Sequence, residues 1–211
     1  MGPGLSLAGP VGFDLDLTLI DSQAAILAAW AEVAQETGTL IDLDSVTRRL
    51  GIKLEDEAAH WFPAGQREAA ADIYRRHYVR LGPELTTSLP GAGEALAAVR
   101  AAGERAIIIT AKHPVSVGTS LIAAGLEADD LYTHVYGPEK AAVLTHVGAA
   151  VYVGDAPADM AAAAEAGVHG VGVATGSFSA ADLMAAGAEV VLGSLLEFPP
   201  WYAAARGGVA G

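Results

Sequence analysis

The chain has 211 residues, of which 52% are apolar and 18% charged, a composition suited to one sizeable folded domain or to a core with a modest insertion. Twelve Lys and Arg residues stand against 25 Asp and Glu residues, and the resulting net charge of -13 argues against a nucleic acid or an anionic membrane as a partner. The absence of cysteine excludes disulfides and thiolate chemistry, and together with the lack of a long apolar run it leads us to expect a cytoplasmic protein.

The first predicted strand, Val11–Leu15, is followed by a long segment with helical periodicity and no predicted strand before residue 90. The helices expected in this segment are Ser22–Thr37, Asp44–Leu50, Leu54–Trp61 and Gln66–Leu81. The pattern predicts an all-helical insertion between the first strand and the remainder of the domain.

From Pro90 onward, short β-branched segments alternate with Ala-rich segments of helical period, which is typical of βα units that build a parallel sheet. The expected strands are Glu104–Thr110, Leu131–Tyr136, Ala150–Gly154, His169–Val173 and Glu189–Leu192. The expected helices are Gly91–Ala102, Pro114–Ala124, Glu139–Val147, Pro157–Ala166 and Ser179–Ala186. The predicted fold is therefore α/β, a Rossmann-like parallel sheet flanked by helices, with a core domain of residues 1–21 and 88–211 and a small helical cap domain of residues 22–87.

Two acidic pairs lie where predicted strands end. Asp14 and Asp16 close the first strand, and Asp155 and Asp159 follow the strand Ala150–Gly154. Either pair alone is also compatible with a turn or a helix cap. Because the carboxyl ends of parallel strands share one edge of a sheet, the two pairs together favour a hard divalent cation, and we expect Mg²⁺.

Two further residues are predicted at the same edge. Thr110 ends the strand ERAIIIT, and Lys140 opens a helix after Gly137-Pro138. Each alone is equally compatible with a turn residue or an exposed side chain. Together with the acidic pairs they supply a hydroxyl and an ammonium group, a combination that suits phosphoryl transfer.

The segments FDLDLTLIDS, IIITAK, GPEK and GDAPADM, in this order, resemble the four motifs of the haloacid dehalogenase-like superfamily, and LPGAGEALAAVRAAG resembles the helix before the second motif in its phosphoglycolate phosphatase-like branch. The resemblance implies that Asp14 is the nucleophile, that Asp16 is a general acid and base whose carbonyl binds Mg²⁺, and that Asp155 and Asp159 serve the metal. It also implies that Thr110 binds the transferred phosphoryl group and that Lys140 neutralises charge.

The sequence departs from that pattern at two positions. Leu17 stands where the family usually has Gly, so we expect a loop backbone that a side chain tolerates. Ala111 stands where many relatives have Asn, and we expect it to line the substrate site with one polar contact fewer. The presence of Asp16 argues against dehalogenation, since the dehalogenase branch lacks this acid.

In the cap, Arg48, Arg49 and Lys53 flank a break between two helices. They are the candidates for binding the leaving group of a small anionic phosphorylated substrate. Charges on solvated helix faces explain these residues equally well. The predicted function is a Mg²⁺-dependent phosphatase acting on a phosphoglycolate-like or similar phosphomonoester through an aspartyl-phosphate. A sugar-phosphate phosphomutase and a catalytically weak protein that binds a phosphorylated ligand are the alternatives. A monomer or homodimer is expected.

Overall fold

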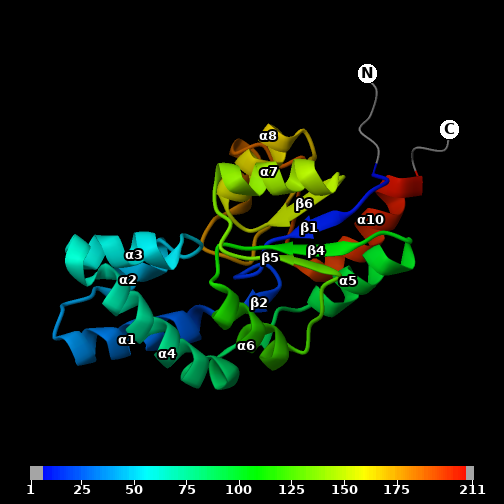
Figure 1. Cartoon of the computed structure of the whole chain (residues 1–211). Coiled ribbons are helices and arrows are strands. Elements are labelled where there is room, and N and C mark those ends of the chain that lie inside the picture. Colours follow the sequence, from blue (N-terminus) through cyan, green and yellow to red (C-terminus); the bar gives the residue numbers. More distant parts are fainter. Residues whose placement is uncertain (1–6, 208–211) are drawn as a thin grey trace.

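A computed structural model describes residues 7–207 of the chain (Figure 1). Its centre is a six-stranded sheet in the order β5-β4-β1-β6-β7-β8, in which every pairing is parallel. The strands are β1 (Val11–Phe13), β4 (Ala106–Ile109), β5 (Asp130–Tyr132), β6 (Val151–Gly154), β7 (His169–Val173) and β8 (Val190–Leu192). The α/β fold class predicted from the sequence is confirmed.

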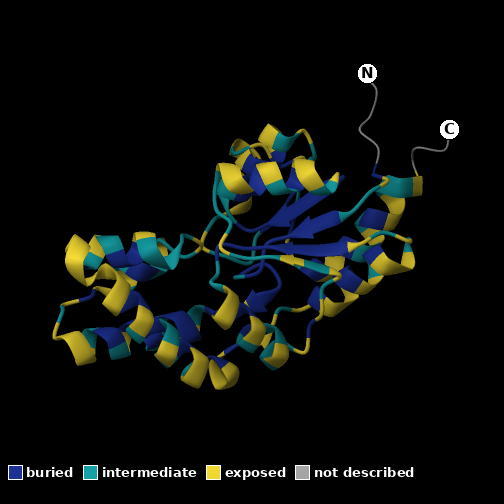
Figure 2. Cartoon of the chain, in the orientation of Figure 1, coloured by how far each residue is buried: buried dark blue, intermediate teal, exposed yellow. Residues whose placement is uncertain are grey.

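Helices cover both faces of the sheet, whose central strands β1, β4 and β6 are buried (Figure 2). On one face, Ile107 and Ile109 pack in a cluster with α7 (Pro138–Val147) and α8 (Pro157–Ala166). On the other, Ile108 packs with α5 (Ala92–Ala101), α6 (Pro114–Ala124) and α10 (Phe198–Gly207). The alternation of neighbouring side chains between faces is the two-residue period of a strand, and burial on both faces explains why these strands are almost wholly apolar. The short helix α9 (Ala180–Ala185) packs beside β7 and β8.

The residues between β1 and α5 form a helical group with its own apolar cluster. Its elements are α1 (Gln23–Thr37), α2 (Leu43–Arg48), α3 (Leu54–Trp61), the 3-10 turn Ala64–Gln66 and α4 (Arg67–Leu85). Trp30, Val33, Phe62, Tyr74 and Tyr78 are among the buried members of that cluster. Figure 1 shows these helices lying beside one end of the sheet.

Two short strands join this helical insertion to the core. Ile20–Asp21 (β2) pairs in antiparallel fashion with Thr87–Ser88 (β3), so the chain enters and leaves the insertion at one place. The prediction of no strand before residue 90 was wrong for β3. A strand of two residues is too short to show an alternating pattern, and only its pairing partner defines it.

Other differences concern the ends of elements. α4 continues to Leu85, past Pro83, instead of ending at Leu81, and β5 ends at Tyr132 rather than Tyr136. Helix α10 was not predicted, and the aromatic ring of Phe198 in it packs edge-on against Phe13 with a centroid distance of 5.4 Å. Within residues 7–207, no helix is both long enough and apolar enough to span a membrane.

Candidate active site

Polar side chains follow three neighbouring strands at the point where each strand ends. Asp14 follows β1, Thr110 follows β4 and Asp155 follows β6. Because β4 and β6 both pair in parallel with β1, the three residues leave the sheet at its carboxyl edge. This is the edge at which open α/β sheets bind their ligands.

Asp14, Asp155 and Asp159 form a group of buried carboxylates, which we call the acid cluster. One carboxylate oxygen of each residue lies within 4.8 Å of those of the other two, and the residues are 7%, 5% and 2% exposed, respectively. Asp159 reaches the cluster from the first turn of α8. Three buried carboxylates repel one another unless positive charge lies among them.

Lys140, in the first turn of α7, supplies part of that charge. Its Nζ donates hydrogen bonds to Asp14 Oδ1 and to Asp159 Oδ1, both at 2.7 Å, and the residue is buried. Burial nevertheless raises the pKa of Asp14 to about 7, although the Lys140 charge acts in the opposite direction. Burial, together with the neighbouring Asp14, also raises the pKa of Asp155 well above its usual value. One ammonium group therefore cannot offset all three carboxylates when they are ionised, and the ionised acid cluster carries an excess of negative charge.

The oxygens of Asp159 are largely committed within the protein. Besides the bond from Lys140, Oδ1 accepts one from the Tyr152 hydroxyl at 3.2 Å, and Oδ2 accepts one from the backbone N–H of Ala156 at 3.2 Å. Asp159 is thereby held in place, and it holds Lys140 in turn. Its contacts are those of a residue that orients its neighbours.

Asp155, by contrast, accepts a single hydrogen bond among the described residues, from Thr18 Oγ1 at 2.9 Å. Its other oxygen, Oδ2, lies against the backbone of Gly176, where a Cβ atom would be only 1.9 Å away. The open coordination of Asp155, the excess charge and the all-oxygen donors suit a hard divalent cation between Asp14 and Asp155. The residues present therefore fit the metal that the acidic pairs predicted.

The side chain of Asp16 points to different partners. Its Oδ1 accepts hydrogen bonds from Lys112 Nζ at 2.7 Å and from the Ser22 hydroxyl. Lys112 is buried, with its Nζ 4.3 Å from the centroid of the Tyr78 ring. The Asp16 side chain thus stays outside the acid cluster, which leaves only its backbone carbonyl for the metal role that the sequence predicted.

Leu17 adopts the left-handed backbone conformation, with φ of +62°. For a residue other than Gly, this conformation costs about 1–2 kcal/mol. The turn is held by a hydrogen bond from the Leu17 N–H to the carbonyl of Ile20 at 2.8 Å and by one from Thr175 Oγ1 to the Leu17 carbonyl at 2.6 Å. The expected tolerance for a side chain is therefore met at a conformational cost, in the loop that aims Asp16.

A cavity lies between the acid cluster and the helical insertion. Its core wall contains Asp14, Asp16, Thr110, Ala111, Lys112, His113 and Ser116. Thr110 is buried, and its Oγ1 accepts a hydrogen bond from the Lys112 N–H at 3.1 Å, which leaves the hydroxyl proton for another acceptor. The structure thus brings Thr110 and Ala111, both predicted to contact the substrate, to the same cavity as the predicted nucleophile.

Arg49 lines the opposite wall, but its guanidinium is already engaged. Its Nε and one terminal nitrogen donate to the two oxygens of Glu57 at 2.9 and 2.7 Å, and the other terminal nitrogen donates to Ser45 Oγ at 2.6 Å. Glu57 also accepts a hydrogen bond from Trp61 Nε1 at 2.6 Å. The side chain of Glu57 is 6% exposed and that of Arg49 is 25% exposed, so this is a partly buried ion pair. Three of the five guanidinium N–H groups are engaged.

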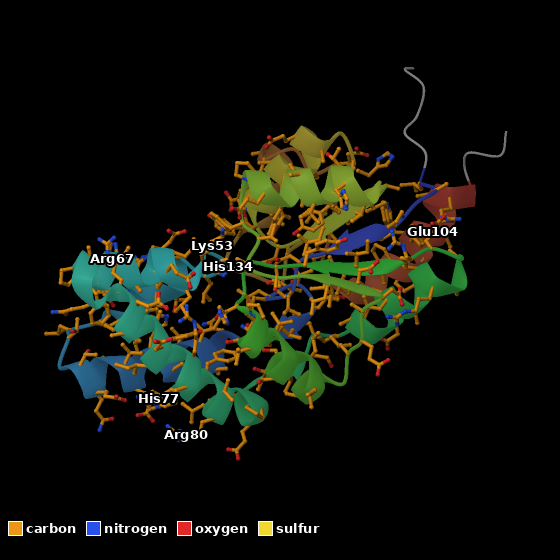
Figure 3. All side chains as sticks on the ribbon, viewed as in Figure 1. Lys53, Arg67, His77, Arg80, Glu104 and His134 are labelled. Atoms are coloured by element: carbon orange, nitrogen blue, oxygen red, sulfur yellow. The ribbon has the colours of Figure 1, made fainter. Side chains whose placement is uncertain are left out.

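The other two cap candidates do not line the cavity. Arg48 is exposed, 3.8 Å from Asp42. Lys53 lies where the insertion faces the core in Figure 3, and its Nζ donates to Glu139 at 2.6 Å. The structure thus brings only one of the three predicted cap cations to the cavity.

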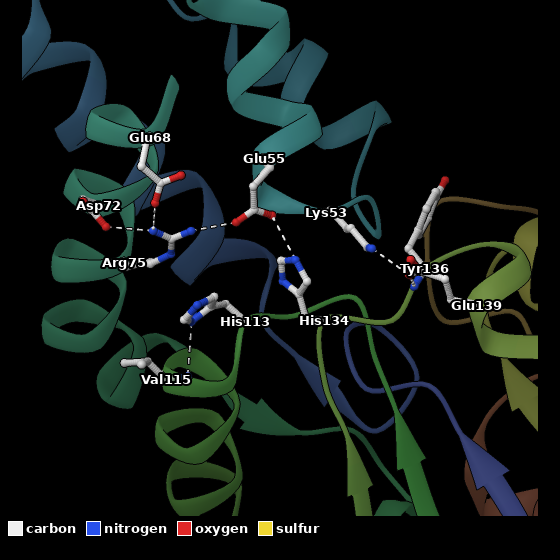
Figure 4. A network of polar contacts seen from close by, with 10 residues as sticks. All are labelled: Lys53, Glu55, Glu68, Asp72, Arg75, His113, Val115, His134, Tyr136 and Glu139. Atoms are coloured by element: carbon white, nitrogen blue, oxygen red, sulfur yellow. Dashed lines mark hydrogen bonds and ion pairs between the residues drawn. The ribbon is translucent and has the colours of Figure 1, made fainter. Parts of the chain in front are cut away.

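Polar contacts between the insertion and the core continue beyond Lys53 (Figure 4). The His134 ring is 3.9 Å from Glu55, which also accepts a hydrogen bond from Arg75 at 2.6 Å. At the other side of the insertion, the Tyr78 hydroxyl lies 3.0 Å from Ser120 Oγ in a buried contact. The insertion is therefore docked on the core around the cavity.

Sequence reasoning missed several residues that hold the site. Lys112 and Ser22 bind Asp16, Thr18 binds Asp155, and Glu57 neutralises Arg49. The one available signal was position, since Lys112 follows Thr110 and Ser22 follows the first acidic motif. The partners of Lys112 and Thr18 lie 96 and 137 residues away in the chain, beyond any local pattern. Ser22 and Glu57 lie 6 and 8 residues from their partners, but neither separation is one that brings two side chains together on a single helix or strand.

The parallel α/β core has a carboxylate after its first strand and a second acidic group after β6. A buried Thr and a buried Lys lie between these two groups in the sequence. This arrangement defines a hydrolase of the haloacid dehalogenase class. The chain belongs to the haloacid dehalogenase-like hydrolase family, whose model matches residues 11–164, and a related HAD-hydrolase-like model matches residues 134–198. The membership predicted from the motifs is thereby confirmed, and with it the prediction of a hydrolase. Among curated proteins, no sequence matches the chain.

Solved structures resemble the chain over most of its length. A hydrolase from Pseudomonas syringae is 25% identical with a TM-score of 0.76, over 89% of this chain and 94% of that one. A protein described as a predicted phosphatase, from Clostridium acetobutylicum, is 21% identical with a TM-score of 0.80, over 94% and 100%. A candidate beta-phosphoglucomutase from Thermotoga maritima is 22% identical with a TM-score of 0.70, over 93% and 99%. At these identities, the last two establish likeness of fold.

Proposed function

We propose that the protein is a Mg²⁺-dependent phosphatase that hydrolyses a small phosphomonoester through an aspartyl-phosphate on Asp14. The observation that carries this proposal is the position of Asp14, which lies both in the acid cluster and on the wall of the cavity, 2.7 Å from Lys140. A phosphate dianion would meet net negative charge there, so a divalent cation is required to admit it.

The reaction follows from the residues around Asp14. A carboxylate oxygen of Asp14 attacks phosphorus, the ester bond breaks, and the leaving oxygen takes a proton from Asp16. A water then loses a proton to Asp16 and attacks the same phosphorus, which releases inorganic phosphate and restores the Asp14 carboxylate. Lys140 and the Thr110 hydroxyl stabilise the negative charge on the transferred group.

The metal would be held by Asp14, the Asp16 carbonyl and Asp155, with Asp159 orienting the set through Lys140. When bound, it supplies positive charge beside the phosphoryl oxygens. We favour Mg²⁺ because the donors are all oxygen and the group to be neutralised is a phosphate. A cytoplasmic location and a monomeric or homodimeric state remain predictions, as does the cap role of residues 22–87.

Phosphate release from a generic ester, with and without Mg²⁺, tests the proposal. Asp14→Asn should lower kcat by on the order of 10³-fold or more, because the amide cannot form the acyl-phosphate. Asp56→Asn, at an exposed position in the insertion, is the matched control and should behave as wild type. Full turnover by Asp14→Asn would remove the assigned nucleophile.

A phosphomutase remains the second candidate, because the fold is also similar to that of the candidate beta-phosphoglucomutase. A mutase would return the phosphoryl group from Asp14 to a second hydroxyl of a sugar, whereas a phosphatase would deliver it to water. Product analysis separates the two, since only hydrolysis yields a stoichiometric amount of inorganic phosphate. A protein that binds a phosphorylated ligand without turning it over would yield neither product.

A further inference from the structure

The wall that the insertion contributes to the cavity is mainly apolar. It contains Ile26, Trp30, Val46, Leu50, Ile52 and Leu54, and the ring of Tyr74 joins them. These side chains come from α1, from α2 and the loop after it, from the first residue of α3 and from the middle of α4. Because Asp14 and Thr110 stand on the facing wall, this apolar surface meets the part of a substrate that lies beyond its phosphate, which is the leaving alcohol.

The charges on this wall are paired with each other. The Arg49 guanidinium donates to both oxygens of Glu57, and it lies 5.3 Å from the centroid of the Trp61 ring. A carboxylate on the leaving group would have to compete with Glu57 for the two N–H groups that Glu57 occupies. The Glu57 carboxylate would also repel it. Among the described residues, the cation on this wall is therefore already neutralised by a carboxylate, and an anionic leaving group would approach that carboxylate as well.

No other cation near the cavity fills that role. Lys112 is engaged by Asp16. Lys53 is engaged by Glu139, and neither Lys53 nor Arg48 lines the cavity. Among the described residues, every Lys or Arg that lines the cavity thus has a carboxylate partner within 3 Å.

The polar groups that are left are few. Ser116 Oγ is buried at the cavity and has no hydrogen-bond partner among the described residues. This hydroxyl and the His113 ring, which also lines the cavity, can serve a few polar atoms of a ligand, whereas a sugar presents a hydroxyl on nearly every carbon. Beyond the phosphate site, the cavity offers fewer unpaired donors and acceptors among the described residues than a sugar phosphate requires.

We infer that the substrate is a phosphomonoester of an uncharged, predominantly apolar alcohol, aromatic or branched aliphatic, and that the Arg49–Glu57 pair excludes anionic leaving groups. This inference rests on the proposed phosphatase function and specifies its substrate class. It differs from the phosphoglycolate-like substrate expected from the sequence, because that expectation assumed free cap cations.

The test compares esters whose alcohols differ in charge and polarity. Benzyl phosphate and 4-carboxybenzyl phosphate are supplied to the Mg²⁺-loaded protein, alongside phosphoglycolate and glucose 6-phosphate, and kcat/KM is measured by phosphate release. We expect benzyl phosphate to exceed each of the other three by at least about tenfold, a difference of about 1.4 kcal/mol. A higher kcat/KM for phosphoglycolate, 4-carboxybenzyl phosphate or the sugar phosphate would overturn the inference and leave the phosphatase proposal intact.

Binding provides a readout that does not depend on turnover. Titration calorimetry with benzylphosphonate and 4-carboxybenzylphosphonate, each in the presence of Mg²⁺, should show tighter binding of the uncharged compound. If benzylphosphonate binds more tightly but no ester is hydrolysed, the proposed function fails, whereas the preference of the cavity for an uncharged, apolar group stands. If the carboxylated phosphonate binds as tightly, or neither phosphonate binds, the substrate class is wrong.

Two variants connect the preference to the wall. Glu57→Gln frees the Arg49 guanidinium, and we expect the ratio of kcat/KM for 4-carboxybenzyl phosphate to that for benzyl phosphate to rise at least about tenfold. Ile52→Asp, in the loop after α2, should lower kcat/KM for benzyl phosphate by a similar factor even if Glu57→Gln does not fold. Leu40→Asp, at a position 93% exposed and outside the cavity, is the control and should leave kcat/KM unchanged. An unchanged preference in both wall variants would contradict the assignment.

Discussion

Substituting Gly176 by Ala tests the metal site without removing any of its ligands. The added Cβ would lie 1.9 Å from Asp155 Oδ2, whereas ordinary contact begins at 3.4 Å, so the carboxylate has to retreat by about 1.5 Å. A displaced carboxylate loses alignment with the cation. We expect the affinity for Mg²⁺ to fall about 10- to 100-fold, which corresponds to roughly 1.4–2.7 kcal/mol.

Two measurements check this expectation. Phosphate release is followed as a function of Mg²⁺ concentration, and the rise in melting temperature on adding Mg²⁺ is recorded without substrate. Gly93→Ala serves as the control, since a Cβ at that position in α5 meets nothing within 4 Å. If Gly176→Ala keeps the wild-type Mg²⁺ dependence in both assays, Asp155 is not a ligand and the arrangement proposed for the metal is wrong.

Three further outcomes are expected. Because burial raises the pKa of Asp14 to about 7 from 3.8, the folded metal-free protein binds a proton more tightly than the unfolded chain, so this group lowers stability as pH rises from about 4 to 7. Urea unfolding in EDTA should show that loss of stability in wild type and a smaller loss in Asp14→Asn. If the free energy of unfolding falls equally with pH in both proteins, the raised pKa does not belong to Asp14. Lys53→Met should change kcat/KM by less than about threefold and stability by less than about 1 kcal/mol, since its ion pair with Glu139 lies outside the cavity; a large rise in KM would restore Lys53 as a substrate contact. Phe198→Ala should destabilise the core by about 3–5 kcal/mol in the same urea assay, because the ring is fully buried against Phe13, and a loss below 1 kcal/mol would show that α10 is not part of the core.

Residues close together in the sequence predicted the fold well. The helices Pro114–Ala124, Leu54–Trp61 and Pro157–Ala166 and the strand His169–Val173 have the bounds that periodicity, proline and glycine indicated. These signals are local, because a helix or strand imposes its period on its own side chains. What failed was equally local in cause: β3 is too short to show a period, and the aromatic and proline residues that begin α10 do not show a helical one.

The candidate site was likewise predicted in part. The order of strand-end residues determined from the sequence that Asp14, Thr110 and Asp155 would meet at one edge, because parallel strands end together. Which charge pairs with which was decided only by the tertiary structure. Lys112 reaches Asp16 across 96 residues, Glu57 reaches back across a loop to neutralise Arg49, and Leu17 takes a backbone conformation that its side chain disfavours. Pairing depends on distances that folding sets, and no spacing in the sequence encodes them.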